Sequence, residues 1–136
     1  MNLNRDSSDF VVLDRRSCLD LLAQNHVAAV AITVGALPMV LPALYLLRGE
    51  DILVGAAADG ILGRCMPNSI VSLCVHDLGE DLSTGWTVTV TGRAEPIGSP
   101  SELADPDAFR QWGRGGSEQI VVRIGTERIS GRQIQV

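Results

Sequence analysis

The sequence contains no lysine, so all 11 of its basic residues are arginines. Without lysine the chain cannot form a Schiff base with a substrate, and it cannot build a P-loop. Any bound anion must therefore be held by arginine, by hydroxyl groups or by backbone N–H groups. The net charge of −5 also disfavours nucleic acid and anionic membrane surfaces as partners.

Cysteine is scarce, and its spacing excludes the usual cysteine-based sites. Cys18, Cys65 and Cys74 are odd in number, and no pair has the Cys-x-x-Cys spacing. Neither a disulfide framework nor a metal site is indicated, and we expect buried free thiols.

Long apolar runs are also missing. The longest, residues 37–47, is interrupted by Pro38 and Pro42 and is shorter than the roughly 20 residues of a membrane-spanning helix. The polar segment Met1–Asp9 lacks the apolar core of a secretion signal, so we expect a cytoplasmic protein with no membrane partner. The 136 residues, of which 46% are hydrophobic, predict one domain over residues 1–136, with residues 1–9 as a flexible segment.

The first predicted element is a helix that begins after Asp14. Asp14 is the expected N-cap, and Leu13 and Cys18 flank it as a hydrophobic staple. Asn25 is expected to end the helix in a left-handed conformation. This helix should cover one mouth of the β-structure that follows.

The remaining chain is mainly β. Period-two or continuous apolar patterns predict six strands: Val27–Val34, Pro38–Leu47, Ile52–Ala57, Ile70–His76, Trp86–Ile97 and Gln119–Ile124. A short helix is expected near Gly60, and a surface helix over Pro100–Trp112. Pro38 and Pro42 cannot donate to a ladder, so part of their strand should run at an edge or face a ligand. The strand count favours a closed, six-stranded antiparallel barrel.

Several segments together resemble a known family. They are Pro38-x-x-x-Pro42-x-x-Tyr45, a glycine-marked turn at Gly60, Gly85-Trp86-Thr87-Val88-x-Val90-x-Gly92-Arg93-Ala94 and Ser130-Gly131-Arg132. Residues 10–136 resemble the pyridoxamine 5′-phosphate oxidase-like family, in particular its small actinobacterial-type branch of flavin-binding split barrels. The resemblance implies a six-stranded split barrel that forms a homodimer, with flavin mononucleotide (FMN) at the dimer interface.

The resemblance also implies where the cofactor lies. The flavin phosphate would sit near the turn Ala57–Arg64, and the ring would lie against Val40–Leu44. The cofactor-binding residues expected on this basis are Val40, Leu41, Pro42, Ala43, Gly55, Ala56, Ala57, Gly60, Ile61, Leu62, Arg64, Trp86, Trp112 and Arg132. No side chain is needed as a catalytic acid or base, because the flavin carries the reactivity toward a small-molecule substrate.

The chain departs from the family pattern at the phosphate site. The family usually has Arg-Thr and then Gly-Ser/Thr-Lys-Leu, where this chain has Gly55-Ala56 and then Gly60-Ile61-Leu62-Gly63. Because a hydrogen bond to a charged group contributes about 1.5–3 kcal/mol, these losses weaken phosphate binding, and Arg64 is the expected substitute.

Two other functions therefore stay open beside an FMN-dependent oxidoreductase. One is a split barrel that has lost flavin binding and acts as a non-enzymatic dimeric ligand-binding or interaction module. The other is a reductase that depends on the deazaflavin F420.

Other candidate residues are more simply structural. His26 and His76 are expected as structural histidines with satisfied hydrogen bonds, and Trp86 as a packing residue. Trp112 and Arg132 also suit a dimer interface without cofactor contact. The acidic loop with Asp77, Glu80 and Asp81 is expected to be solvated.

Overall fold

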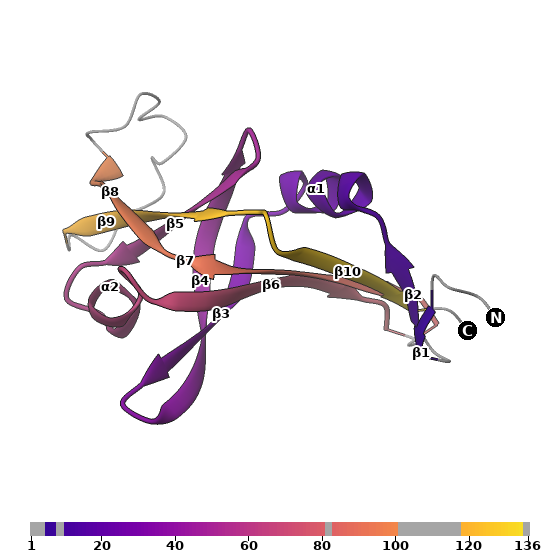
Figure 1. The fold of residues 1–136 in the computed structure, drawn as a ribbon, viewed down its shortest axis with the longest axis horizontal. Helices are drawn as coiled ribbons and strands as arrows, with labels where there is room; N and C mark the ends of the chain where they lie inside the picture. Colours follow the sequence, from indigo (N-terminus) through magenta and orange to yellow (C-terminus); the bar gives the residue numbers. More distant parts are fainter. Residues whose placement is uncertain (1–4, 8–9, 81–82, 101–117, 135–136) are drawn as a thin grey trace.

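The computed structural model describes residues 5–7, 10–80, 83–100 and 118–134 (Figure 1). Most of the helix predicted over Pro100–Trp112 lies outside the described residues, as does Asp81. The strands are β1 (Arg5–Ser7), β2 (Phe10–Leu13), β3 (Val27–Val34), β4 (Leu37–Arg48), β5 (Asp51–Ala57), β6 (Ile70–Leu78), β7 (Gly85–Arg93), β8 (Glu95–Gly98), β9 (Gln119–Gly125) and β10 (Ile129–Ile134). The helices are α1 (Arg15–Ala23) and α2 (Ile61–Cys65).

All described strands belong to one antiparallel sheet with the order β1-β2-β10-β7-β6-β3-β4-β5-β9-β8. Strand β8 continues the chain from β7 after Ala94, and it pairs with β9. The last strand in this order therefore belongs to the same segment of chain as β7. The circuit β6-β3-β4-β5-β9 therefore closes through β7 and β8. This is the predicted six-stranded split barrel, with β10, β2 and β1 added along the other part of β7.

Each of the six predicted strands is present, but the described part of the chain has ten strands rather than six. The predicted strand Trp86–Ile97 divides at Ala94, whose backbone exchanges hydrogen bonds with the Asn68–Ser69 segment. Strand β8 is the second part of this divided strand. Strands β1 and β2 were missed because three or four residues carry too little pattern. Strand β10 was missed because its Ser-Gly-Arg-Gln centre has no apolar alternation.

Helix α1 packs along the barrel, on the side that Figure 1 shows above β10. Its N-cap is confirmed, because the Asp14 carboxylate accepts the Ser17 N–H at 2.8 Å. The predicted left-handed stop at Asn25 is wrong, because Asn68 is the one non-glycine residue with a positive φ in the described part of the chain. The Gln24 C-cap has φ −90°, and the Asn25 side chain instead donates to the Leu21 carbonyl at 2.8 Å. A short polar side chain thus satisfies a terminal carbonyl without a left-handed residue.

The core fills the barrel interior and extends beneath α1. Val30, Leu73 and Val88 are fully buried on the inner face, together with Tyr45, whose hydroxyl donates to the Leu22 carbonyl of α1 at 2.7 Å. This bond and the apolar contacts of Leu22 join the helix to the barrel. Among the described residues, no helix is both long and apolar enough to cross a lipid bilayer.

Pro38 and Pro42 lie at a free strand edge, as predicted. Strand β4 pairs with β3 along Leu37–Leu44, but it pairs with β5 only over Leu44–Arg48. Pro38 and Pro42 are therefore in the half of β4 that has no β5 partner. On that side of the strand no hydrogen bond is lost when proline lacks an N–H. Beyond the pair formed by Leu44 and Gly55, β4 and β5 separate and leave an opening in the wall.

Candidate functional site

The candidate site is a groove that runs along the free half of β4. Two adjoining depressions form it, with volumes of about 510 and 270 Å³, and both are lined by Leu41 and Pro42. Because both depressions are lined by Leu41 and Pro42, they form one groove, which extends from the α1–β3 connection to α2.

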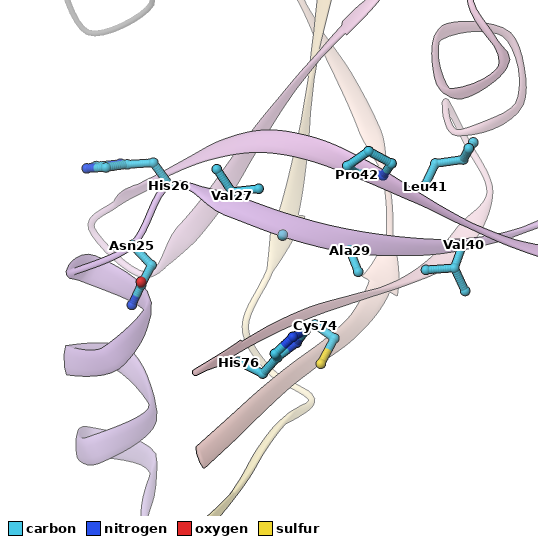
Figure 2. Close-up of a pocket in the computed structure, with 10 residues that line it drawn as sticks. Asn25, His26, Val27, Ala29, Val40, Leu41, Pro42, Cys74 and His76 are labelled. Atoms are coloured by element: carbon cyan, nitrogen blue, oxygen red, sulfur yellow. The ribbon is translucent and has the colours of Figure 1, made fainter. Parts of the chain in front are cut away.

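Side chains of β3, β4 and β6 line the larger depression, together with the segment before β3. Its lining residues are Asn25, His26, Val27, Ala28, Ala29, Val40, Leu41, Pro42, Cys74 and His76. Figure 2 shows Cys74 and His76 next to one another on β6, near Ala29 of β3. The register explains this arrangement, because Ala29 is directly opposite both Pro42 and Cys74. Small residues in the middle of the row leave space above the sheet.

The smaller depression lies at the opening where β4 and β5 separate. Its lining residues are Leu41, Pro42, Ala56, Ala57, Gly60, Ile61 and Leu62. The wall beyond β5 is α2, which approaches the strand closely at Gly63. A Cβ atom at Gly63 would clash with the Ala57 carbonyl oxygen, so only glycine allows this approach. The Ala57 carbonyl also accepts the Gly60 N–H at 3.0 Å, which fixes the turn before α2.

Polar donors at this turn come mainly from the backbone. The first N–H groups of a helix have no intrahelical acceptor, and Ile61 and Leu62 occupy that position in α2. None of the side chains that line the smaller depression carries a hydrogen-bond donor. Arg64 is adjacent: its Nε donates to the Gly60 carbonyl at 3.4 Å, which places an exposed guanidinium beside the turn.

The structure brings most of the predicted cofactor residues together. Those that line the groove are Val40, Leu41, Pro42, Ala56, Ala57, Gly60, Ile61 and Leu62. Ala43 instead points into the core and is 9% exposed, because alternate residues of a strand face opposite sides. Gly55 lies in the ladder between Leu44 and Val121.

The remaining predicted site residues lie elsewhere. Trp86 is half-buried against the core and lines a separate depression with α1 residues, in agreement with its interpretation as a packing residue. Arg132 is on β10, opposite Val12 and Thr87. Trp112 lies outside the described residues.

Sequence reasoning missed the histidines and Cys74 as groove residues. His26 and His76 are exposed and line the groove, so their interpretation as satisfied structural histidines is wrong. Cys18 is buried as expected, whereas Cys74 is half-buried and faces the groove. The signal was present in the strand period, since Cys74 and His76 are two residues apart on β6 and must share a face. Within the described residues, no group of three or more His, Cys, Asp or Glu is placed to hold a metal ion.

Comparison with known proteins identifies the family. The family profile described as pyridoxamine 5′-phosphate oxidase matches residues 14–133, which covers both walls of the groove. The chain belongs to this family. A relative from Mycobacterium tuberculosis, the uncharacterised protein Rv0080, is 28% identical over 135 residues, covering 96% of this chain and 89% of the relative.

Solved structures support the same fold. An FAD-binding protein from Mesorhizobium loti has a TM-score of 0.75 at 20% identity, covering 93% of this chain and 98% of the other. The FAD-binding protein from Mycobacterium smegmatis has a TM-score of 0.70 at 20% identity, covering 91% and 97%. An FAD- and haem-binding protein from the same organism has a TM-score of 0.73 at 15% identity, covering 90% and 72%.

Proposed function

We propose that this member of the pyridoxamine 5′-phosphate oxidase family binds a flavin in the groove along β4 and serves as a flavin-dependent oxidoreductase. The observation that carries the proposal is the continuous groove at the family's expected cofactor position, shared by the strand residues Leu41 and Pro42 and the turn before α2. The FAD-binding proteins with the same fold support a flavin as the class of ligand.

The groove suits the flavin ring. A planar aromatic ring needs a flat, largely apolar surface, and Ala29, Val40 and Pro42 provide one without bulky side chains. Cys74 would place a weakly polar thiol at the edge of the ring, and His76 would place a strongly polar imidazole there. A bound flavin supplies hydride or electron transfer, while the chain's own residues position the ring and exclude water.

The α2 turn suits a phosphate less well. The donors available there are the backbone N–H groups at the start of α2 and the guanidinium of Arg64. FMN is the first candidate because its single phosphate matches this small set of donors. One partly solvated arginine, Arg64, here replaces the several charged or hydroxyl donors that usually hold the phosphate. We therefore expect FMN to bind more tightly than riboflavin by about tenfold at most.

A homodimer is part of the proposal. Val27, Val40 and Leu44 are 61%, 68% and 37% exposed on the outer face of the β3–β4 hairpin, where Val27 and Val40 line the groove and Leu44 is directly opposite Val27. Apolar side chains clustered on one face of a sheet favour a protein partner. A second copy of the chain would cover this face, close the groove from above and shield the flavin from solvent.

A second candidate function rests on the apolar lining of the smaller depression. Without a side-chain donor there, the groove also suits an uncharged apolar ligand, and the chain would then be a non-enzymatic dimeric module. The deazaflavin F420 is the remaining alternative as the redox cofactor.

The test is a set of absorbance and fluorescence titrations of the purified chain with riboflavin, FMN, FAD and F420. We expect saturable flavin binding at one site per chain, and its loss in Ala29→Phe, whose ring would fill the groove. Val12→Phe on β2 is the control, because it adds the same ring to an exposed position outside the groove. Binding of F420 alone would select the deazaflavin alternative, and binding of none of these ligands would leave the non-enzymatic module.

The oligomeric state is tested separately by sedimentation equilibrium. Leu44→Asp places a charge on the exposed apolar face without replacing a residue that lines the groove. We expect a dimer for the unmodified chain and for the control Val12→Asp, and a monomer for Leu44→Asp. A monomer for the unmodified chain over micromolar concentrations contradicts this part of the proposal.

A further inference from the structure

A third depression lies outside the groove and has a different chemical character. It has a volume of about 350 Å³ and is lined by Ile70, Thr91, Gly92, Arg93, Glu127 and Arg128. Two of these residues are arginines, in a chain whose net charge is −5. Positive charge here is therefore a local feature that opposes the overall charge of the protein.

The register of the sheet brings the two arginines to one place. Arg93 is two residues after Thr91 on β7, so both side chains point to the outer face, opposite to the buried Val90. Arg128 precedes β10, and its carbonyl accepts the Thr91 N–H at 3.0 Å. Diagonal neighbours of this kind are about 7–8 Å apart, a separation across which two long guanidinium side chains can reach one ligand.

Neither guanidinium is used by the fold. Among the described residues, neither Arg93 nor Arg128 forms a side-chain hydrogen bond or an ion pair, and both are exposed. Arg123, by contrast, pairs with Asp51 and Glu95 and so stabilises the joint of β5, β8 and β9. The Arg93 and Arg128 side chains keep all of their donors for a ligand.

The surroundings favour a compact oxyanion. The Thr91 hydroxyl forms a hydrogen bond with the Ser72 hydroxyl at 2.7 Å, and this bond links β7 to β6 beneath the pocket. The carboxylate of Glu127 lies against Gly125, where an added Cβ atom would meet it, and it forms no ion pair with either arginine. Two arginines against one carboxylate leave a net positive pocket, and the planar guanidinium fork suits phosphate oxygens.

We propose that Arg93 and Arg128 form an anion-binding pocket, separate from the α2 turn, that accepts a phosphate group. The pocket opens on the same outer face as Cys74 and His76, since Thr91 and Ser72 are one row along the sheet from Thr89 and Cys74. A phosphorylated substrate held by the two arginines would extend its remaining part along that face toward the groove. The proposal does not depend on flavin binding.

The experiment is a titration of the full chain with inorganic phosphate at constant ionic strength, followed by NMR through the side-chain Nε–Hε signals of the arginines. We expect saturable shifts of the Arg93 and Arg128 signals in the millimolar range. Arg93→Gln and Arg128→Gln should each weaken phosphate binding about tenfold or more, because each removes a charge-assisted donor. Arg48→Gln is the matched control, an exposed arginine at the end of β4 that lines neither this pocket nor the groove, and it should leave the affinity within twofold.

Shifts that do not saturate, or that are as large for Arg48 as for Arg93 and Arg128, overturn the proposal. A second arm identifies the source of the phosphate. If riboflavin and FMN both leave bound phosphate in place, the pocket serves a phosphate other than that of the flavin. If FMN displaces phosphate and riboflavin does not, the pocket stands and the placement of the flavin phosphate at α2 is wrong. Failure of all flavins to bind removes the proposed function but leaves the phosphate titration interpretable.

Discussion

The two faces of the same strands differ in what their side chains do. On the inner face of β3, β4 and β6, Val30, Tyr45 and Leu73 have no exposed surface. On the outer face, small or apolar residues such as Ala29 and Val40 are left uncovered, and the groove is among them. Because strand residues alternate between faces, one segment of sequence can carry the core and the binding surface at the same time. Substitutions on the inner face should therefore change stability, and those on the outer face should change ligand or partner binding.

The largest expected difference compares two neighbouring residues of β6. Leu73→Ala should lower the free energy of unfolding by about 2–5 kcal/mol, because it leaves a cavity in a packed core. Cys74→Ala, on the outer face, should lower it by less than about 1 kcal/mol. Denaturant unfolding at one fixed protein concentration measures both changes. Equal effects of the two substitutions would contradict the division between the faces.

The inner face also predicts how stability depends on pH. Burial raises the pKa of the Tyr45 hydroxyl, which donates to the Leu22 carbonyl. A raised pKa of an acid in the folded state means that stability is complete below the unfolded pKa of about 10 and falls above it, by up to about 1.4 kcal/mol per pH unit. The raised pKa of the buried Cys18 thiol adds a loss of the same sign. Denaturant unfolding as a function of pH measures the slope.

Tyr45→Phe separates the contribution of the hydroxyl from that of the thiol. The variant should be less stable near neutral pH by about 0.5–1.5 kcal/mol but should lose less stability at alkaline pH. Since the chain has a single tyrosine, the ultraviolet absorbance of tyrosinate reports this group alone. Ionisation of the tyrosine in the folded protein at its ordinary pKa would show that the hydroxyl is not buried.

A smaller effect is expected on the outer face at the α2 turn. Ile61→Ser adds a hydroxyl to the smaller depression, at a side chain that is 38% exposed. One new hydrogen bond to a charged phosphate should strengthen FMN binding by about 1–2 kcal/mol, or about fivefold to thirtyfold, without changing riboflavin binding. Fluorescence titration measures both ligands, and Val12→Ser is the control. An equal gain for riboflavin would place the flavin phosphate away from this turn.

The sequence predicted much of the barrel because its six main strands have a strong period. The free edge of β4 also followed from chemistry, since Pro38 and Pro42 lack an N–H. The strand β10 could not be predicted, because its position depends on a long-range contact. Gly131 lies beneath α1, where an added Cβ atom would be 2.5 Å from the Cys18 sulfur atom.

The candidate site was predicted only in part, for a similar reason. The resemblance to the family indicated the β4 and α2 residues. Local spacing places Cys74 and His76 on one face of β6, but it does not indicate that they or Ala29 line the groove. These residues join the groove through the register of β3 with β4 and β6, which depends on pairing between distant segments. Arg93 and Arg128 come together in the same way, through the pairing of β7 with the segment before β10.

The position of the flavin is tested by a crystal structure of the chain grown with FMN. We predict a flavin ring against Ala29, Val40 and Pro42, with a second copy of the chain covering Val27 and Leu44. A flavin bound on another face of the barrel, or a groove that stays empty at saturating FMN, would contradict it.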